Sequence, residues 1–214
     1  MKSLQILILL SVVLFSCEPK EKSIQLNNTT QPADVQEVTL LKATENKEAL
    51  VLTTDALQLV DQITGSSNEL PFGMPQNQLI EIINNTFQSK AVSFGINTEC
   101  GAGPLKMVKW NNGLTLVFQE NNTKSTEPKT DWLFEGWYVD GGIDIEGAQK
   151  LTTMAGIGIG STLAEMHSAY EIEVKETSLG QEFSTASGLY GILDGAGKNA
   201  KIIYLWSGVS CNFR

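Results

Sequence analysis

The residues that could carry out chemistry are few, and the first of them is the single histidine, His167. A Ser-His-Asp hydrolase needs an imidazole beside its serine, and His167 alone could supply it. The sequence contains neither a Gly-x-Ser-x-Gly elbow nor a Ser-x-x-Lys motif. When the internal repeat described below is aligned, His167 falls on an apolar residue, Ile80. We therefore interpret His167 as a half-buried packing residue and predict no catalytic residue.

Two glycine-containing segments resemble ligand-binding loops, but each lacks part of the pattern. Gly156, Gly158 and Gly160 precede a helical pattern as in a dinucleotide-binding loop, yet Ser161 stands where that pattern requires glycine. We interpret these glycines as a tight turn. Residues 140–146 carry acidic side chains spaced more widely than the ligands of a calcium loop, which predicts a polar turn. We predict no metal and no cofactor.

Charge and composition restrict the class of partner. The chain has 15 basic against 24 acidic side chains, a net charge of -9, and 42% hydrophobic residues. Nucleic-acid binding depends on clustered Lys and Arg that neutralise phosphates, so nucleic acid is excluded as the expected partner. The hydrophobic content is sufficient for a folded domain.

The N-terminus has the pattern of a bacterial export signal. Lys2 is followed by a largely apolar run from Leu4 to Phe15, which is too short to span a bilayer. Residues Leu14-Phe15-Ser16-Cys17 resemble the lipobox of bacterial lipoproteins. That resemblance implies a signal peptide over residues 1–16, cleavage before Cys17 and acylation of Cys17, so that the membrane is a partner through the lipid anchor.

The segment after the anchor has the composition of a tether. Residues 17–36 begin with the lipidated Cys and continue with Lys, Glu, Asn, Gln, Thr and Pro, and have too few apolar side chains to fold. In the lipoproteins, Asp directly after the anchor is the better-known signal for inner-membrane retention; Glu18 stands there and favours the outer membrane. We expect a protein anchored in the cell outer membrane, facing either the periplasm or the outside.

Once Cys17 is assigned to lipid, Cys100 and Cys211 remain. Outside the cytoplasm, two remaining thiols usually form a disulfide. Two free or metal-binding thiols are the alternative, although two cysteines and one histidine so far apart do not have the spacing of a zinc site.

A faint internal repeat relates two parts of the chain. Gly73 aligns with Gly160, and Leu79 with Met166, a shift of 87 residues (160 minus 73). In each copy, an apolar segment reaches the glycine and a helical pattern follows, predicted over residues 75–87 and 162–170. The second copy begins with Thr162 and Glu165, which have the spacing of a capping box.

Alternating patterns after each helix predict antiparallel strands. Asn112-Gly113, between two alternating runs, is a strong hairpin signal. The fold class predicted is α+β, with two tandem repeats of one helix and an antiparallel sheet, over residues 37–147 and 148–214.

This arrangement resembles the tandem-repeat fold of the β-lactamase inhibitor proteins and of the small outer-membrane assembly lipoproteins. The resemblance rests on the helix entries at Gly73 and Gly160, the apolar pairs one turn later, and aromatic residues in the following strands. It implies binding or assembly as the activity. The chain departs from the inhibitors because each of their repeats closes its own disulfide, whereas Cys100 and Cys211 would join the first repeat to the C-terminus.

Aromatic residues in the predicted strands are the remaining candidates for a site. One face of each sheet must meet a helix, so rings on the other face are exposed unless another layer covers them. Such rings suit protein binding because they are large and rigid, although core packing is the alternative for each of them. The candidate binding surface comprises Trp110, Trp132, Phe134, Trp137, Tyr138 and Trp206.

These observations favour a non-enzymatic binding module of the bacterial envelope, inhibitor-like or assembly-related, that contacts a protein or envelope ligand through a sheet face. A carboxylate-based hydrolase acting on envelope glycans is the alternative, because paired acids could come from the 24 acidic residues. A purely structural lipoprotein is the third hypothesis.

Overall fold

The structure is a computed structural model that describes residues 48–121, 132–141 and 149–211. Cys17, the predicted signal peptide, the tether, and Asp144 and Glu146 of the acidic loop lie outside the described residues. No helix within the described part of the chain is long and apolar enough to cross a membrane.

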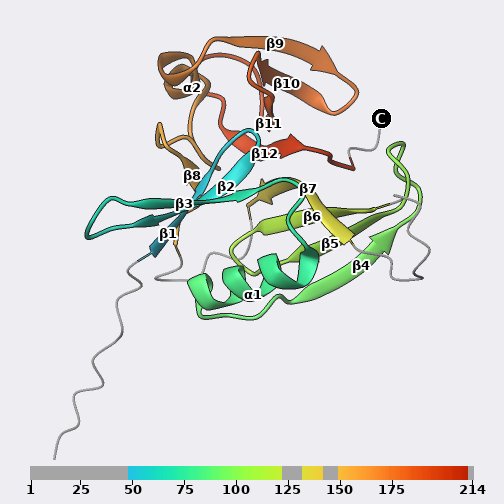
Figure 1. Ribbon diagram of the computed structural model, residues 1–214. Coiled ribbons are helices and arrows are strands. Elements are labelled where there is room, and N and C mark those ends of the chain that lie inside the picture. The colour runs from blue at the N-terminus through green and yellow to red at the C-terminus, as the bar shows by residue number, and fades with distance from the viewer. Residues whose placement is uncertain (1–47, 122–131, 142–148, 212–214) are drawn as a thin grey trace, which may run out of the picture. The chain divides into compact units, whose positions relative to one another are not determined.

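The larger of two sheets has eight antiparallel strands in the order β4-β5-β6-β7-β12-β11-β10-β9 (Figure 1). Asn112-Gly113 forms the predicted turn between β5 and β6, with Gly113 at a φ of 90°. Because β7 pairs with β12, strands from distant parts of the chain form one continuous sheet. The bounds of these strands are β4 Ser93–Asn97, β5 Leu105–Lys109, β6 Leu114–Glu120, β7 Trp132–Asp140, β9 Ile172–Thr177, β10 Gly180–Thr185, β11 Leu189–Leu193 and β12 Ile202–Gly208.

A second sheet of four strands, in the order β3-β2-β1-β8, was not predicted. It contains β1 Glu48–Leu52, β2 Ala56–Asp61, β3 Ser67–Pro71 and β8 Thr152–Thr153, and only β1 and β8 pair in parallel. Its buried side chains join the core of the larger sheet, where the indole Nε1 of Trp137 donates to the Thr53 carbonyl at 2.8 Å. The small sheet therefore packs on the core face of the large one.

Helices α1 (Gln76–Phe87) and α2 (Leu163–Ala169) lie where the apolar spacing predicts them. Each follows a glycine that needs positive φ, 88° at Gly73 and 85° at Gly160. The N–H of Gly73 donates to the Phe134 carbonyl and that of Gly160 to the Ile202 carbonyl, so both helix entries are fixed to a strand of the large sheet. The predicted capping box of Thr162 and Glu165 is confirmed.

The predicted fold class, α+β with two repeats of helix plus sheet, is wrong. Within the described residues, twelve strands accompany only two helices, and the protein is a β-rich fold of two sheets. The fold class differs from the prediction for two reasons. Residues 48–71, with their alternating leucines, form three strands. In addition, β7 pairs with β12, so the strands of the two predicted repeats form one continuous sheet. The two helices and the small sheet share one hydrophobic core with the large sheet.

Candidate binding face

A β-bulge in β7 decides which aromatic side chains meet the core. Val117 of β6 faces Gly136, but the next residue, Phe118, faces Phe134, so β7 has one extra residue at Glu135. Strict alternation would place Phe134 and Trp137 on opposite faces, whereas the bulge brings both into the core. Period-two spacing would place Phe134 on the same face as Tyr138, and a bulge cannot be recognised from that spacing.

Most of the aromatic residues predicted to form a surface are buried. Trp110, Phe134 and Trp137 are at most 1% exposed, and the indole of Trp110 donates to Asn84 Oδ1 at 3.0 Å. These three side chains are core residues, and the prediction that they contact a partner is wrong. Trp132 is partly buried against the same core, with Lys106 Nζ 4.6 Å from its ring centroid.

Tyr138 and Trp206 do lie on the opposite face of the large sheet. Tyr138 stands between the buried residues Trp137 and Val139, and Trp206 between Leu205 and Ser207, so each points away from the core. Cross-strand pairing aligns Tyr138 with Trp206 and Trp206 with Tyr190. Of the predicted surface residues, Tyr138 lies on this face and is partly exposed. Trp206 lies on the same face but is buried, so the prediction that it contacts a partner is wrong. Two tyrosines join these residues on this face.

We call Tyr138, Tyr190, Tyr204 and Trp206 the aromatic face. Tyr138 and Tyr204 stack with ring centroids 5.6 Å apart, and Tyr190 and Trp206 with centroids 5.8 Å apart. Trp206 is only 4% exposed, whereas Tyr190 is 38% exposed. Tyr190 was missed at the sequence level, whereas Tyr204 was recognised as an aromatic residue of a predicted strand but was not assigned to the candidate surface.

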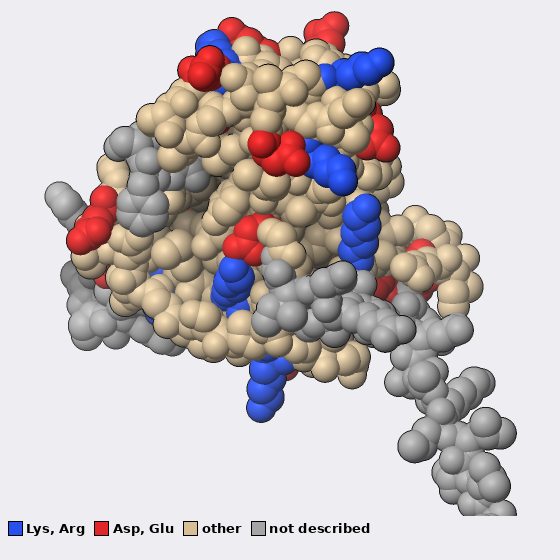
Figure 2. All heavy atoms as spheres, turned by 180° about the vertical axis from the view of Figure 1, so that it is seen from behind, with Lys and Arg blue, Asp and Glu red and all other residues tan. Residues whose placement is uncertain are grey.

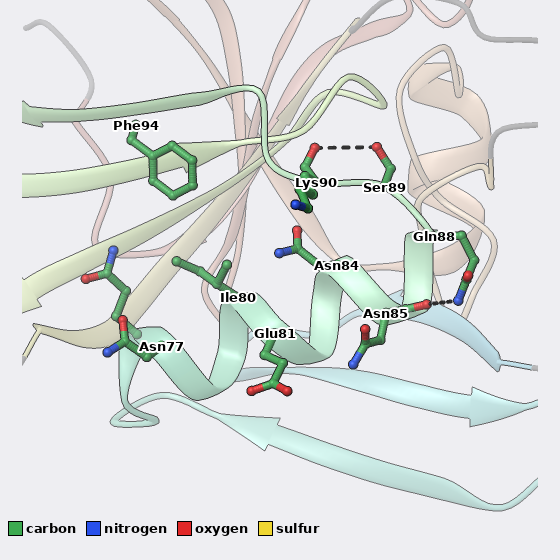
Figure 3. A pocket seen from close by; sticks show the side chains of 10 residues that line it. Asn77, Ile80, Glu81, Asn84, Asn85, Gln88, Ser89, Lys90 and Phe94 are labelled. Carbon is green, nitrogen blue, oxygen red and sulfur yellow. Dashed lines mark hydrogen bonds between the residues drawn. The ribbon is translucent and has the colours of Figure 1, made fainter.

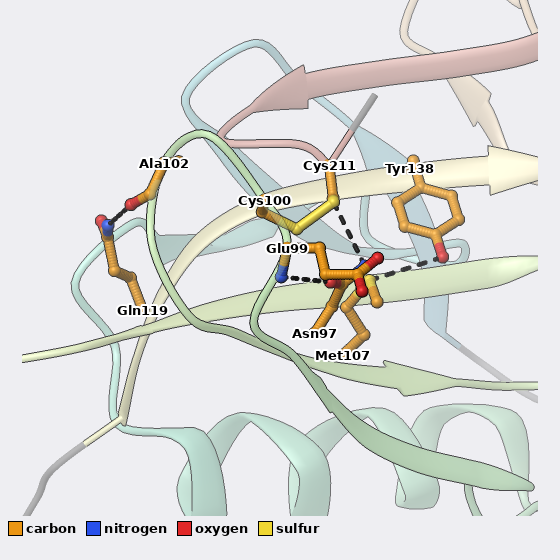
Figure 4. The surroundings of a disulfide bond; sticks show 8 residues. All are labelled: Asn97, Glu99, Cys100, Ala102, Met107, Gln119, Tyr138 and Cys211. Atoms are coloured by element: carbon orange, nitrogen blue, oxygen red, sulfur yellow. Dashed lines mark hydrogen bonds between the residues drawn. A yellow bond between two sulfur atoms is a disulfide. The ribbon is translucent and has the colours of Figure 1, made fainter. Parts of the chain in front are cut away.

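A cavity of about 240 Å³ opens beside the Tyr138–Tyr204 stack. The hydroxyl of Tyr138 donates to Met107 Sδ at 3.9 Å, so this end of the cavity is fixed by a weak hydrogen bond (Figure 4). Most of the wall is apolar or aromatic, which suits a hydrophobic group of a ligand. The lining residues are Asn97, Met107, Tyr138, Leu179, Ile192, Tyr204 and Cys211.

The predicted disulfide between Cys100 and Cys211 is confirmed, with the Cα atoms 5.4 Å apart. It joins the loop after β4 to the segment after β12 and forms part of the cavity wall (Figure 4). Asn97 donates from Nδ2 to Cys211 Sγ at 3.3 Å, while its Oδ1 accepts the Glu99 N–H at 2.9 Å. The bridge and Asn97 therefore hold this side of the cavity in place.

The pKa of Tyr204 lies above its ordinary value. Burial, the largest cause, together with the nearby Tyr138 and Asp140, raises the pKa of Tyr204 to about 12. Asp140 forms an ion pair with Lys109 at the border of the face. At neutral pH the Tyr204 hydroxyl is protonated, as an ordinary tyrosine would be, and Tyr204 lines the cavity, so it can donate a hydrogen bond there. On the side of the molecule seen in Figure 2, acidic and basic side chains are interspersed among uncharged ones.

The residues first considered for chemistry are not brought together. His167 is exposed on α2, so its predicted packing role is wrong: the short α2 buries Met166 and turns His167 to solvent. Gly156 and Gly160 have positive φ and form the predicted tight turn. The residues that the structure describes contain no cluster of three or more metal-ligating side chains.

A second hollow, of about 600 Å³, lies between α1 and β4 (Figure 3). Asn84 Oδ1 accepts both the Trp110 indole and the Ala91 N–H, at 3.0 and 3.1 Å, which fixes the orientation of its amide. Glu81 is the only carboxylate among the described residues of this groove. The groove is lined by Gln76, Asn77, Ile80, Glu81, Asn84, Asn85, Gln88, Ser89, Lys90 and Phe94.

Comparison with known proteins gave no family model, no curated protein and no solved structure that matches this chain.

Proposed function

We propose that this protein is a non-enzymatic binding module that recognises another protein or an envelope ligand through the aromatic face. The observation that carries the proposal is the presence of two pairs of stacked rings, Tyr138 with Tyr204 and Tyr190 with Trp206, on the side of the large sheet opposite the core. Both helices and the small sheet pack on the core side.

The arrangement of the rings supports binding rather than catalysis. Stacking and the underlying strands hold each ring in place, so little conformational entropy is lost when a partner covers it. Tyr190, which is 38% exposed, offers accessible apolar area, and the neighbouring cavity could accept one apolar side chain of the partner. The neutral Tyr204 hydroxyl supplies a donor at the edge of that contact.

The chemistry of the partner follows from this surface. An aromatic face with an apolar cavity of about 240 Å³ favours a partner that presents an uncharged, apolar or aromatic side chain. The hydroxyl of Tyr204 would pair with a carbonyl or another acceptor beside that side chain.

The hydrolase alternative receives less support from the same geometry. Glycoside hydrolysis in most families needs two carboxylates flanking the scissile bond. The cavity beside Tyr204 has no carboxylate among its described lining residues, and the α1–β4 groove has Glu81 alone. A binding role therefore agrees better with the described surface, because it does not require a second carboxylate.

Attachment to the outer membrane belongs to the same proposal. Acylated Cys17 would anchor the chain, and the polar residues 18–36 would let the folded body reach partners in the envelope. Replacing Cys17 with Ala should release the protein from the membrane fraction, whereas Glu18→Gln, a matched neighbour, should leave it attached. If Cys17→Ala stays in the membrane fraction, the anchoring argument is wrong.

Site-specific photo-crosslinking tests the aromatic face. A photoreactive residue at position 190 should crosslink a partner in intact cells, whereas the same residue at position 63, where Ile63 is 72% exposed on a turn, should not. The partner identified in this way should bind purified Tyr190→Ala and Tyr204→Ala at least about tenfold more weakly than the unaltered protein. Ile63→Ala is the control for binding.

Two outcomes would contradict the proposed function. Equal crosslinking at positions 63 and 190 would mean that the aromatic face has no special role. Turnover of an envelope glycan by the purified protein, abolished by Glu81→Gln, would favour the hydrolase instead.

A further inference from the structure

The two outer strands of the large sheet differ in how their open edges are protected. Strand β9 carries Glu173, Lys175 and Glu176, and charged side chains of this kind discourage pairing with another chain. Strand β4 reads Ser93-Phe94-Gly95-Ile96-Asn97 and has no charged residue and no proline. Its inner edge pairs with β5, and no described strand pairs with its outer edge.

The apolar side chains of β4 are unusually exposed. Phe94 is 62% and Ile96 is 56% exposed, although both point to the side of the sheet on which α1 packs. The helix covers the neighbouring strands and leaves the groove of Figure 3 between itself and Phe94. An uncharged edge with two exposed apolar side chains is a template for adding another strand.

The sequence of this edge is complementary to itself. Antiparallel pairing of two β4 strands about a two-fold axis at Gly95 would place Phe94 opposite Ile96 of the second copy, and Ser93 opposite its Asn97. Such an axis is perpendicular to the sheet, so Phe94 and Ile96 of both copies lie on the same side and cover each other. In this pairing, the exposed apolar side chains of one copy are covered by those of the other copy.

We propose that the open edge of β4 is a self-association site, at which two copies of this chain join their large sheets by antiparallel β4–β4 pairing. Five paired residues and two apolar side chains from each copy form a small interface, so the dimer is weak in solution, with a dissociation constant in about the micromolar range or above. The site is separate from the aromatic face and does not depend on the proposed function.

Disulfide trapping tests the pairing and its register. Gly95 would lie opposite Gly95 of the second copy, and a Cβ at this position meets no heavy atom within 4 Å, so Gly95→Cys should keep the fold and form an intermolecular disulfide. Ser93→Cys is the matched control on the same strand. Its two sulfurs would lie far apart, because the Ser93 Cα atoms would be separated by about four residues of extended strand, roughly 14 Å.

Sedimentation velocity of the full-length protein in detergent tests association without a new cysteine. The unaltered protein should show a concentration-dependent dimer, and Ile96→Lys should remove it while leaving the melting temperature unchanged. Ile63→Lys changes an even more exposed apolar residue outside β4 and should keep the dimer.

Two results would overturn the proposal. The first is a monomer at every concentration up to about a hundredfold above the micromolar range. The second is equal disulfide trapping of Gly95→Cys and Ser93→Cys.

Discussion

Cys100 and Cys211 lie with their Cα atoms 5.4 Å apart although 111 residues separate them in the chain. The disulfide joins the loop after the outer strand β4 to the segment after the central strand β12. With Leu105 and Val117 it forms a small apolar cluster separate from the main core. This cluster covers part of the sheet face that carries Tyr138.

Removing the disulfide should destabilise the whole domain. Closing a loop of this length restricts the unfolded chain, and the chain-entropy model gives about 4 to 5 kcal/mol in favour of the folded state. We expect the double variant Cys100→Ser with Cys211→Ser to lose about this free energy of unfolding in urea denaturation. Reductant should destabilise the unaltered protein equally and leave the double variant unaffected. A loss below about 1 kcal/mol would mean that the C-terminal segment is held without the disulfide.

Glycine at position 136 should be required for the close packing of the segment that follows β12. A Cβ at this position would overlap the carbonyl oxygen of Val209, a backbone atom that cannot move without displacing the chain toward Cys211. Gly136→Ala should therefore lower the free energy of unfolding by about 1 to 3 kcal/mol, as overpacked sites do. Denaturation monitored by tryptophan fluorescence measures this loss.

Gly95→Ala is the matched control for Gly136→Ala. A Cβ at Gly95 meets no heavy atom within 4 Å, so this substitution should change the free energy of unfolding by less than about 0.5 kcal/mol. If both substitutions cost the same, the close approach of Val209 to Gly136 is not what requires glycine.

The local elements could be predicted from the sequence because their causes are local. Helix α1 follows from apolar spacing after Gly73, α2 from the capping box of Thr162 and Glu165, and the β5–β6 turn from Asn112-Gly113. Each of these signals lies within a few residues of the structure that it determines.

The remaining features depend on contacts between distant residues. The bulge at Glu135 is visible only in the pairing of β7 with β6, and it reverses the face of Phe134 relative to Trp137. The pairing of β7 with β12 likewise joins two parts of the chain that the repeat treats as separate units. For this reason the helices were predicted correctly while the fold class and most of the aromatic surface were not.

The capping box of α2 should be measurable through both mutation and pH. Thr162 Oγ1 accepts the Glu165 N–H at 3.2 Å, and Glu165 Oε2 accepts the Thr162 N–H at 2.7 Å. Thr162→Ala should cost about 1 kcal/mol of unfolding free energy, the usual loss for a removed N-cap. Thermal denaturation at neutral pH measures this effect.

The hydrogen bonds from the Thr162 backbone and side chain lower the pKa of Glu165 below its ordinary value of 4.5. Because the folded pKa is depressed, the stabilisation is present above the unfolded pKa and is lost as the pH falls through the folded value. Glu165→Gln retains an acceptor but no charge, so it should remove this part of the acid dependence. An unchanged acid dependence in Glu165→Gln would assign it to other carboxylates.

Tyr204 should titrate later than an ordinary tyrosine, because burial raises its pKa from 10.0 to about 12. A group whose folded pKa is raised contributes stability that is complete below its unfolded pKa and is lost as the pH rises through the folded value. The free energy of unfolding should therefore fall between about pH 10 and pH 12 in the unaltered protein, and this fall should be smaller in Tyr204→Phe. Tyrosinate absorbance should be followed over the same pH range. The part of the absorbance increase that occurs at the highest pH, here called the late fraction, should disappear in Tyr204→Phe and persist in Tyr190→Phe. If Tyr204→Phe keeps the late fraction, the neutral hydroxyl assigned to the aromatic face is not that of Tyr204.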